Sequence, residues 1–349
     1  MFNMIYADHK DIDFEVIYYA ETEPNRQWVY LKRENAYPHR FMKSLYYENF
    51  GFSSYFSYRS FFEKINCECL ILGGSWTHLN NWILACRAKI SGTRVIFWSE
   101  SHAKSIARKN YIIRIMRKCF YKIFDGYLCP NHEAICYIKN NLGIDSPIYY
   151  FPNTIDERQY ARNIEGRCIS IDPMVKFVTV ARLEHFKGVV ELIKEFNNIN
   201  KKNNWHLTIV GDGSLRNNVK QIISDLKLGD KIELVAHVDP KDMPQIYKEA
   251  HVFLLNTFRD PSPLSLVEAA FCGLMLGTTK FCGNSALLVT EKNGFIAKDD
   301  GGILSRDLEL ILEMPIDKIK SKGCLSIELA KSHCSIEIVA DVLRKLNKL

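Results

Sequence analysis

Short apolar runs alternate with longer amphipathic segments along the whole chain. The apolar runs are Phe14–Ala20, Cys69–Leu72, Val95–Trp98, Gly126–Cys129 and Ile148–Phe151 in the first half, and Lys176–Val180, His206–Val210, Lys231–Val235, His251–Leu255 and Met275–Thr278 in the second. Between them, segments such as Gly188–Asn198 and Arg216–Leu228 repeat apolar residues every three or four positions, as amphipathic helices do. We therefore expect an α/β fold with two parallel sheets, each covered by helices on both faces.

A polar stretch separates the two groups of apolar runs. Between Asn153 and Met174 neither a strand pattern nor a strong helix pattern occurs, and a chain of 349 residues is longer than one hydrophobic core usually organises. We expect an N-terminal domain at residues 1–155, a C-terminal domain at residues 156–330, and a helix at residues 331–349 that crosses back towards the N-terminal domain.

The beginning of the chain departs from the usual order of a doubly wound domain, which opens with a strand and a tight glycine loop. The first apolar run, Phe14–Ala20, follows a polar, helix-like segment that begins at Met1. The first domain is therefore expected to lack its first strand. A truncated and inactive protein is one interpretation of this departure.

Composition adds a prediction about the cellular compartment. Apolar residues make up 47% of the chain and charged residues 25%, which is typical of globular proteins. The 11 cysteines are irregularly spaced without a C-x-x-C pair, which favours reduced thiols over a disulfide framework or a zinc site. Since we find no signal-peptide pattern and no apolar run near the roughly 20 residues of a membrane span, we expect a cytoplasmic protein.

Two cations follow one of the predicted strands. The strand that ends at Val180 continues as Ala181-Arg182-Leu183-Glu184-His185-Phe186-Lys187-Gly188, and a helix comes next. Ligands of open α/β sheets bind at the carboxyl ends of the strands. Because Arg offers a fork of donors and Lys a point charge, Arg182 and Lys187 suit a diphosphate. The alternative is a solvated loop with two surface cations.

A second loop with candidate binding groups follows the strand that ends at Leu255. Two prolines, at 261 and 263, mark a loop that enters a helix, so the amides of Leu264 and Ser265 would form an anion site at the helix N-terminus. Asp260 precedes this helix, and Glu268 lies one turn beyond Leu264 on the same face. A carboxylate there suits the hydroxyls of a ribose. Alternatively, Asp260 is an N-cap and Glu268 a charge on the helix surface.

Together these residues resemble glycosyltransferase family 4. The matching elements are Arg182…Lys187-Gly188 for its R-x(4)-K-G element, Val210-Gly211-Asp212-Gly213 for its V-G-x-G turn, Asp260-x(7)-Glu268 for its E-x(7)-E element and Pro152-Asn153-Thr154-Ile155-Asp156 for its P-N-x-I-D element. The resemblance covers about residues 95–300. It implies a GT-B fold, in which two Rossmann-like domains face a cleft that binds a nucleotide-sugar donor.

The resemblance also implies roles for individual residues. Arg182 and Lys187 would hold the donor diphosphate, Glu268 the ribose, and Asp260 the hydroxyls of the transferred sugar. Gly211, Gly213, Leu264, Ser265 and Asn153 would complete the substrate-binding site. The family transfers sugars with retention of anomeric configuration, and it needs neither a metal nor another cofactor. Asp260 stands where the family usually has Glu, and Pro263 where Gly is common.

The acceptor side rests on weaker patterns. Strand Val95–Trp98 ends in Ser99-Glu100-Ser101-His102, a region where the family often presents a histidine to the transferred sugar. His102 is offset from the expected place, so Glu100 competes with it for this role, and a structural role for His102 is the alternative. Arg26 lies in the loop after the first strand, which either meets the acceptor or simply connects a strand to a helix.

A basic segment suggests a further partner. From Lys104 to Lys122 there are seven Lys or Arg residues and no acidic ones, interleaved with large apolar residues. Such a helix either lies on an anionic membrane surface or packs its apolar face on the sheet. Nucleic acid is not expected, because no recognition motif accompanies the basic stretch. We interpret the aromatic cluster from Tyr46 to Phe62 as core and helix-face packing rather than an acceptor platform.

By resemblance, the predicted activity is transfer of a hexose-type sugar to a glycan or lipid-linked acceptor in bacterial polysaccharide or envelope synthesis. A GT-B sugar-nucleotide epimerase and a truncated, non-catalytic nucleotide-sugar-binding protein are the alternatives. A dinucleotide enzyme is disfavoured, because Arg216 stands at the third glycine position of the fingerprint and Glu233 lies inside a predicted strand. The only D-x-D sequence, Asp11-Ile12-Asp13, precedes a strand and is poorly placed to bind a metal.

Overall fold

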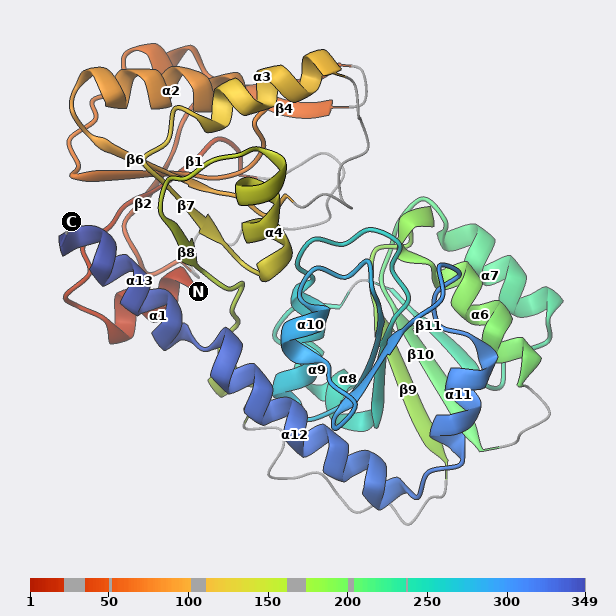
Figure 1. The fold of residues 1–349 in the computed structure, drawn as a ribbon. Coiled ribbons are helices and arrows are strands. Elements are labelled where there is room, and N and C mark those ends of the chain that lie inside the picture. The colour runs from red at the N-terminus through yellow and green to blue at the C-terminus, as the bar shows by residue number, and fades with distance from the viewer. Residues whose placement is uncertain are drawn as a thin grey trace. The chain divides into compact units, whose positions relative to one another are not determined.

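The structure is a computed structural model that describes residues 1–21, 35–49, 52–101, 111–161, 174–199, 204–236 and 238–348. The chain forms two compact units (Figure 1): unit 1 comprises Met1–Pro152 together with Ile336–Leu349, and unit 2 comprises Asn153–Ser335. Unit 2 begins at Asn153, whose side chain donates to the carbonyl of Ser262, and Ile155 packs into the core of the same unit.

Unit 2 is built on six parallel strands in the order β11-β10-β9-β12-β13-β14. The strands are β9 (Val175–Val180), β10 (Trp205–Val210), β11 (Ile232–Val235), β12 (Val252–Leu255), β13 (Met275–Thr279) and β14 (Gly294–Ala297). The two central strands, β9 and β12, are nearly continuous apolar runs because both faces of the sheet are covered. The predicted parallel sheet is confirmed, and β14 extends it by one strand.

Helices cover both faces of this sheet and bury a separate hydrophobic cluster on each. One cluster is formed with α6 (Val189–Asn198), α7 (Arg216–Asp225) and α11 (Ser305–Leu312), and the other with α8 (Met243–Glu249), α9 (Leu264–Phe271) and α10 (Ser285–Leu288). The short helix α5 (Glu157–Ala161) and the long helix α12 (Ile316–Cys334) also pack on α9. The carboxyl ends of the strands, where helices do not cover the backbone, carry the candidate site.

Unit 1 contains a four-stranded parallel sheet in the order β5-β6-β7-β8. Its strands are β5 (Cys69–Leu72), β6 (Arg94–Trp98), β7 (Gly126–Cys129) and β8 (Ile148–Tyr150). One face packs against α2 (Leu79–Ile90), α3 (Tyr111–Tyr121) and α4 (His132–Cys136), which a short π-helix (Tyr137–Asn141) continues. Among the described residues, no helix has the length and apolarity that a bilayer crossing requires.

The other face of this sheet is covered by the two ends of the described chain. Helix α1 (Phe2–Asp8) and helix α13 (Ile336–Lys348) lie side by side (Figure 1), and both contribute buried side chains to one cluster with the sheet. Arg344 of α13 also forms an ion pair with Asp11, which follows α1. Both aspartates of the D-x-D sequence thus lie between α1 and the first strand, and Asp11 is engaged by an arginine.

Unit 1 also contains two small sheets. Strand β1 (Val16–Tyr18) pairs in parallel with β2 (His39–Phe41), and β3 (Leu45–Asn49) forms an antiparallel hairpin with β4 (Phe52–Phe56). The interpretation of Tyr46–Phe62 as core and helix-face packing is wrong for most of this segment. It forms a hairpin and a 3₁₀ turn, and its exposed rings include Tyr46, Tyr58, Phe61 and Phe62.

Candidate functional site

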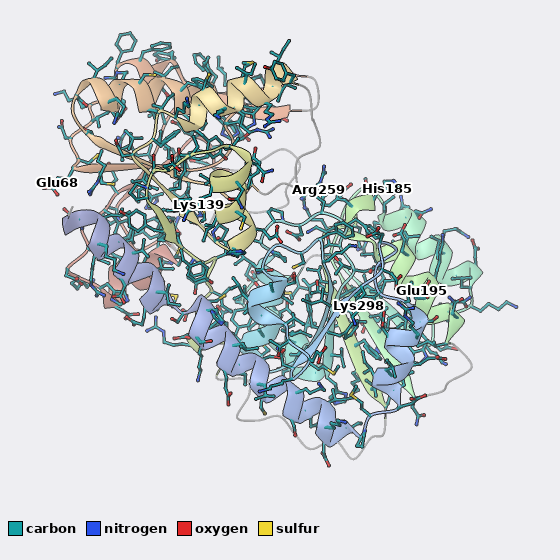
Figure 2. All side chains as sticks on the ribbon, in the orientation of Figure 1. Glu68, Lys139, His185, Glu195, Arg259 and Lys298 are labelled. Carbon is teal, nitrogen blue, oxygen red and sulfur yellow. The ribbon has the colours of Figure 1, made fainter. Side chains whose placement is uncertain are left out.

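The candidate binding residues of unit 2 follow neighbouring parallel strands. Arg182 lies two residues after β9, Lys187 ends a 3₁₀ turn in the same loop, and Asp260 lies in the loop after β12. Because β9 pairs directly with β12, the two loops emerge next to each other at one edge of the sheet. His185 and Arg259, one from each loop, accordingly lie at the same end of unit 2 (Figure 2).

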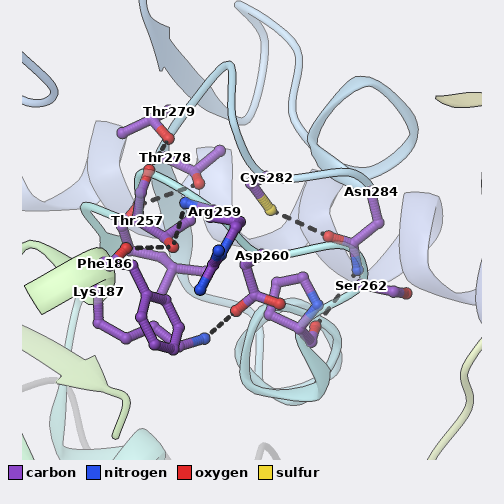
Figure 3. A network of polar contacts seen from close by, with 12 residues as sticks. Phe186, Lys187, Thr257, Arg259, Asp260, Ser262, Thr278, Thr279, Cys282 and Asn284 are labelled. Carbon is purple, nitrogen blue, oxygen red and sulfur yellow. Dashed lines mark hydrogen bonds and ion pairs between the residues drawn. The ribbon is translucent and has the colours of Figure 1, made fainter. Parts of the chain in front are cut away.

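Lys187 and Asp260 are joined by an ion pair (Figure 3). Their side chains are only 11% and 10% exposed, so each charge depends on the other to replace lost solvation. Asp260 is further fixed by its backbone, which donates to the carbonyl of Phe281 at 3.2 Å and accepts from Gly283 at 2.9 Å. Asp260 is therefore not the N-cap of α9, a role held by Pro263.

The two loops are also tied together through the backbone of Phe186. Its carbonyl accepts hydrogen bonds from the amide of Phe258 at 2.8 Å and from the hydroxyl of Thr257 at 3.0 Å (Figure 3). Gly188 turns the chain into α6 with φ +63°, and a Cβ there would lie 2.1 Å from the carbonyl oxygen of Asn256. The glycine thus permits the close approach that brings Lys187 to the β12 loop.

The glycine turn after β10 supports the loop that carries Arg182. A Cβ on Gly211 would lie 2.0 Å from the carbonyl oxygen of Ala181, and one on Gly213 would lie 2.6 Å from that of Leu183. The amide of Leu183 also donates to the carbonyl of Asp212 at 2.9 Å. The residues on both sides of Arg182 are therefore packed against this turn, which fixes where the arginine leaves the backbone.

The N-terminus of α9 forms another part of the edge. The helix begins at Leu264. The amides of Leu264 and Ser265 therefore lie in its first turn, where backbone N–H groups have no carbonyl partner within the helix. The loop before it is held by the side chain of Asn153, which donates to the carbonyl of Ser262 at 3.3 Å, and by that of Asn284, which donates to the carbonyl of Pro263 at 3.3 Å. Asn153 therefore stabilises the loop before α9 through this hydrogen bond.

Glu268 lies one turn into α9 and is held by two phenols. The hydroxyl of Tyr247 donates to Oε2 of Glu268 at 2.8 Å, and Tyr160 hydrogen-bonds the same carboxylate. These are the two tyrosines of unit 2. Burial raises the pKa of Glu268 from its ordinary value of 4.5, while both hydrogen bonds oppose the rise. Glu268 is therefore a half-buried, oriented acceptor rather than a freely solvated charge on the helix surface.

A cation that the sequence patterns did not single out joins the site. Arg259 immediately precedes Asp260, and its guanidinium carbon lies 5.0 Å from the ring centroid of Phe186. Arg182 and Lys187 approach the same ring at 5.5 and 5.6 Å. Among the described residues neither Arg182 nor Arg259 forms an ion pair, and Arg182 acts on the neighbouring Glu184 carboxylate only through a longer-range charge interaction. The signal available in the sequence was the adjacency of Arg259 to Asp260.

The acceptor-side predictions are described only in part. Glu100 follows β6 in unit 1, and its side chain is exposed. His102 and Arg26 lie outside the described residues. Among the described residues no group of three or more His, Cys, Asp or Glu side chains is arranged to hold a metal ion, and metal independence stays a prediction.

The glycine turn also lacks the features of a dinucleotide fingerprint. Arg216 begins α7 and donates to the carbonyl of Gly211 at 3.0 Å, so it is used to close the turn. Glu233 lies within β11 and not at its carboxyl end, where a ribose-binding acid would be needed. The geometry therefore favours the residues around Lys187 and Asp260 as the binding site.

Comparison with known proteins relates this unit to glycosyltransferases. Residues 172–321 match the family model described as Glycosyl transferases group 1, a stretch that contains Arg182, Lys187, Asp260 and Glu268. An uncharacterized glycosyltransferase of Methanocaldococcus jannaschii is 28% identical over 220 residues, which cover 59% of this chain and 53% of that protein. The match supports the group 1 glycosyltransferase family for unit 2.

A second relative is the UDP-Gal:alpha-D-GlcNAc-diphosphoundecaprenol alpha-1,3-galactosyltransferase of Escherichia coli, which is 30% identical over 118 residues. These cover 33% of this chain and 30% of that enzyme. The chain thus spans about half the length of the first relative and less than a third of the second.

The fold is shown by comparison with solved structures. The structure of Anabaena Alr3699/HepE in complex with UDP and glucose is similar with a TM-score of 0.66 and 15% sequence identity. The similarity covers 81% of this chain and 78% of that one. The chain has the GT-B fold, with two Rossmann-like parallel α/β units.

Proposed function

We propose that the protein is a glycosyltransferase that moves a hexose-type sugar from a nucleotide-diphosphate sugar to a glycan or lipid-linked acceptor. The observation that carries this proposal is the convergence of Arg182, Lys187, Asp260, Glu268 and the N-terminus of α9 at one edge of the unit 2 sheet. Cations and free amides suit phosphates, whereas oriented carboxylates suit hydroxyls. A sugar nucleotide presents both groups in one molecule.

The donor diphosphate is bound by Arg182, Lys187 and Arg259 in this proposal. A diphosphate esterified at both ends carries about two negative charges at neutral pH. Since Lys187 is already paired with Asp260, the charges left to balance those of the donor are on Arg182 and Arg259. The ring of Phe186 lies against both guanidinium groups and limits the orientations that they can adopt.

The carboxylates bind the two sugars of the donor. Glu268 accepts hydrogen bonds from ribose hydroxyls, and the two tyrosine hydroxyls hold its carboxylate in place. Asp260 accepts from hydroxyls of the transferred sugar while its ion pair with Lys187 keeps its carboxylate oriented. The amides of Leu264 and Ser265 bind a phosphate oxygen at the positive end of α9.

The reaction proceeds with retention and without a metal. The acceptor hydroxyl oxygen forms a bond to the anomeric carbon on the face from which the phosphate leaves. The bond between that carbon and the phosphate oxygen breaks, and the acceptor proton passes to the leaving phosphate. Guanidinium groups and the helix N-terminus stabilise the charge that develops on the nucleoside diphosphate, which is the task that a metal performs in other transferases.

On the acceptor side we propose contacts from Glu100, His102 and Arg26. The setting is the synthesis of a bacterial polysaccharide or envelope glycan at the cytoplasmic face of a membrane. Support comes from the Escherichia coli relative, whose name specifies a diphosphoundecaprenol acceptor and a UDP-galactose donor, and from HepE, whose structure contains UDP and glucose. Uridine diphosphate sugars are accordingly the first donors to test.

Calorimetric titration with nucleoside diphosphates, their sugar conjugates and NAD, in the presence of a chelator, tests the proposal. We expect saturable binding of one sugar nucleotide, followed by transfer to an isoprenoid-linked or glycan acceptor with the anomeric configuration kept. Binding of NAD alone would overturn the assignment. Conversion of the donor to an epimer without acceptor would favour an epimerase, and donor binding with neither reaction would favour a non-catalytic binding protein.

A further inference from the structure

Helix α3 exposes a group of large apolar residues in its first two turns. Ile112, Ile115 and Met116 are 66%, 46% and 49% exposed, and Tyr111 at the start of the helix is 73% exposed. Cys119 continues this exposed stripe at the same three- and four-residue spacing. A helix that only packed its apolar face on the sheet would bury these residues, so that interpretation holds for Phe120 and Tyr121 but not for this part of α3.

The helix is held in unit 1 by a different set of contacts. Phe120 and Tyr121 are fully buried, and the ring of Phe120 lies 5.0 Å from that of Trp82 and 5.1 Å from that of Phe97. Arg117 donates to the hydroxyl of Tyr137 at 2.9 Å. The contacts that hold α3 on the sheet therefore do not involve the exposed apolar stripe.

A row of cations borders the apolar stripe. Arg114, Lys118 and Lys122 recur every four residues, so they form one line along the helix next to Ile115 and Cys119. All three are exposed, and α3 itself contains no acidic residue. Exposed apolar side chains can insert among the acyl chains of a bilayer, and the neighbouring cations can contact its anionic headgroups.

We propose that the exposed face of α3 is a docking surface for an anionic lipid bilayer. The helix lies in the plane of the interface, with Ile112, Ile115 and Met116 inserted at the level of the upper acyl chains. Arg114, Lys118 and Lys122 contact the headgroup phosphates. The row of cations favours an anionic membrane over a second copy of the chain. A second copy carries the same cations, so the two positively charged faces would repel each other. This docking does not depend on the nucleotide site.

The test is flotation of the full chain with vesicles, without nucleotide. We expect binding to phosphatidylcholine vesicles that contain phosphatidylglycerol, weak binding to phosphatidylcholine alone, and loss of binding at high salt. Ile112→Ser/Ile115→Ser and Arg114→Gln/Lys118→Gln should each lower the partition coefficient roughly tenfold or more. Ile90→Ser, which changes an isoleucine 87% exposed at the end of α2, is the matched control and should bind like the wild type.

Three results would overturn the proposal. They are equal binding by all variants, absence of wild-type binding to anionic vesicles, and a wild-type dimer that Ile112→Ser/Ile115→Ser converts to a monomer. Because these changes are on the exposed face, circular dichroism should show that the variants remain folded. Failure here leaves the donor titration unaffected, so it can be told apart from failure of the proposed transferase activity.

Discussion

Lys187 and Asp260 form a buried ion pair between two loops that leave neighbouring strands of one sheet. The pair joins the candidate diphosphate-binding loop to the candidate sugar-binding loop, so each residue fixes the position of the other. In the proposed function, the donor places its phosphates near Lys187 and its sugar hydroxyls near Asp260. The two side chains are therefore already in position before the donor binds.

The first prediction concerns the stability of this pair. Lys187→Met leaves Asp260 buried beside an apolar side chain, and we expect the free energy of unfolding to fall by about 3 kcal/mol. Lys187→Met/Asp260→Asn removes both charges and should recover part of that loss. Urea denaturation of the three proteins measures the coupling. Equal stabilities for wild type and Lys187→Met would show that the pair contributes nothing.

A second prediction separates the cations around Phe186. Arg259→Gln and Arg182→Gln should each weaken binding of a nucleoside diphosphate roughly ten- to a hundredfold, because a charge-assisted contact to phosphate is lost. Binding of the uncharged nucleoside should not change. Arg306→Gln, which alters an arginine of α11 paired with Asp299, is the control. If Arg259→Gln binds the diphosphate as the wild type does, Arg259 has no place in the donor site.

The third prediction uses the raised pKa of Glu268. Ribose hydroxyls need the ionised carboxylate, so nucleotide affinity should fall as the pH drops through a pKa that lies above 4.5. Tyr247→Phe removes a hydrogen bond that favours the ionised form, and the fall should move to higher pH. Calorimetry over a pH series with wild type and Tyr247→Phe measures the shift. An unchanged profile would argue that the phenol does not tune this carboxylate.

Glu268 also predicts how stability varies with pH. Its pKa is higher in the folded chain than in the unfolded chain, so its contribution to stability is complete below pH 4.5 and is lost as the pH rises through the folded-state pKa. Glu268→Gln cannot ionise and should gain stability relative to wild type as the pH is raised across this window. Thermal unfolding at several pH values tests this, and a constant difference between the two proteins would contradict it.

A fifth prediction concerns the glycine turn. Gly211→Ala and Gly213→Ala would force a Cβ against the carbonyls that flank Arg182, and the φ angles of +149° and +156° add strain. We expect each to cost about 1–3 kcal/mol of stability and to weaken nucleotide binding as the Arg182 loop shifts. Gly229→Ala is the matched control, since nothing lies within 4 Å of the added Cβ. Losses of the same size at all three positions would remove the special role of the turn.

The central strands of both sheets could be predicted from the sequence because strands buried on both faces are continuous apolar runs, such as Val95–Trp98 and Gly126–Cys129. Strand β2 and the hairpin escaped prediction. His39–Phe41 is short and polar, and its role as a strand depends on pairing with β1, a contact that no local pattern encodes.

The same limit applies to the site. Arg182, Lys187, Asp260 and Glu268 stand at spacings that the sequence reveals, whereas their partners come from distant segments. Tyr247 reaches Glu268 from α8, and Phe186 meets Arg259 only because β9 and β12 are neighbours. These contacts arise from strand order, which periodicity along the chain does not determine.

The return of the chain at Ile336 has a consequence for biosynthesis. The core of unit 1 combines Met4 and Ile5 with Val339 and Ala340 of α13, whereas unit 2 is one continuous segment. A ribosome therefore releases every residue of the second unit before it supplies the helix that closes the first. Domains emerging from the ribosome usually mature from the N-terminus onward. In this chain the later segment can finish first, and the nascent first unit must wait with one face of its sheet covered only in part, by α1.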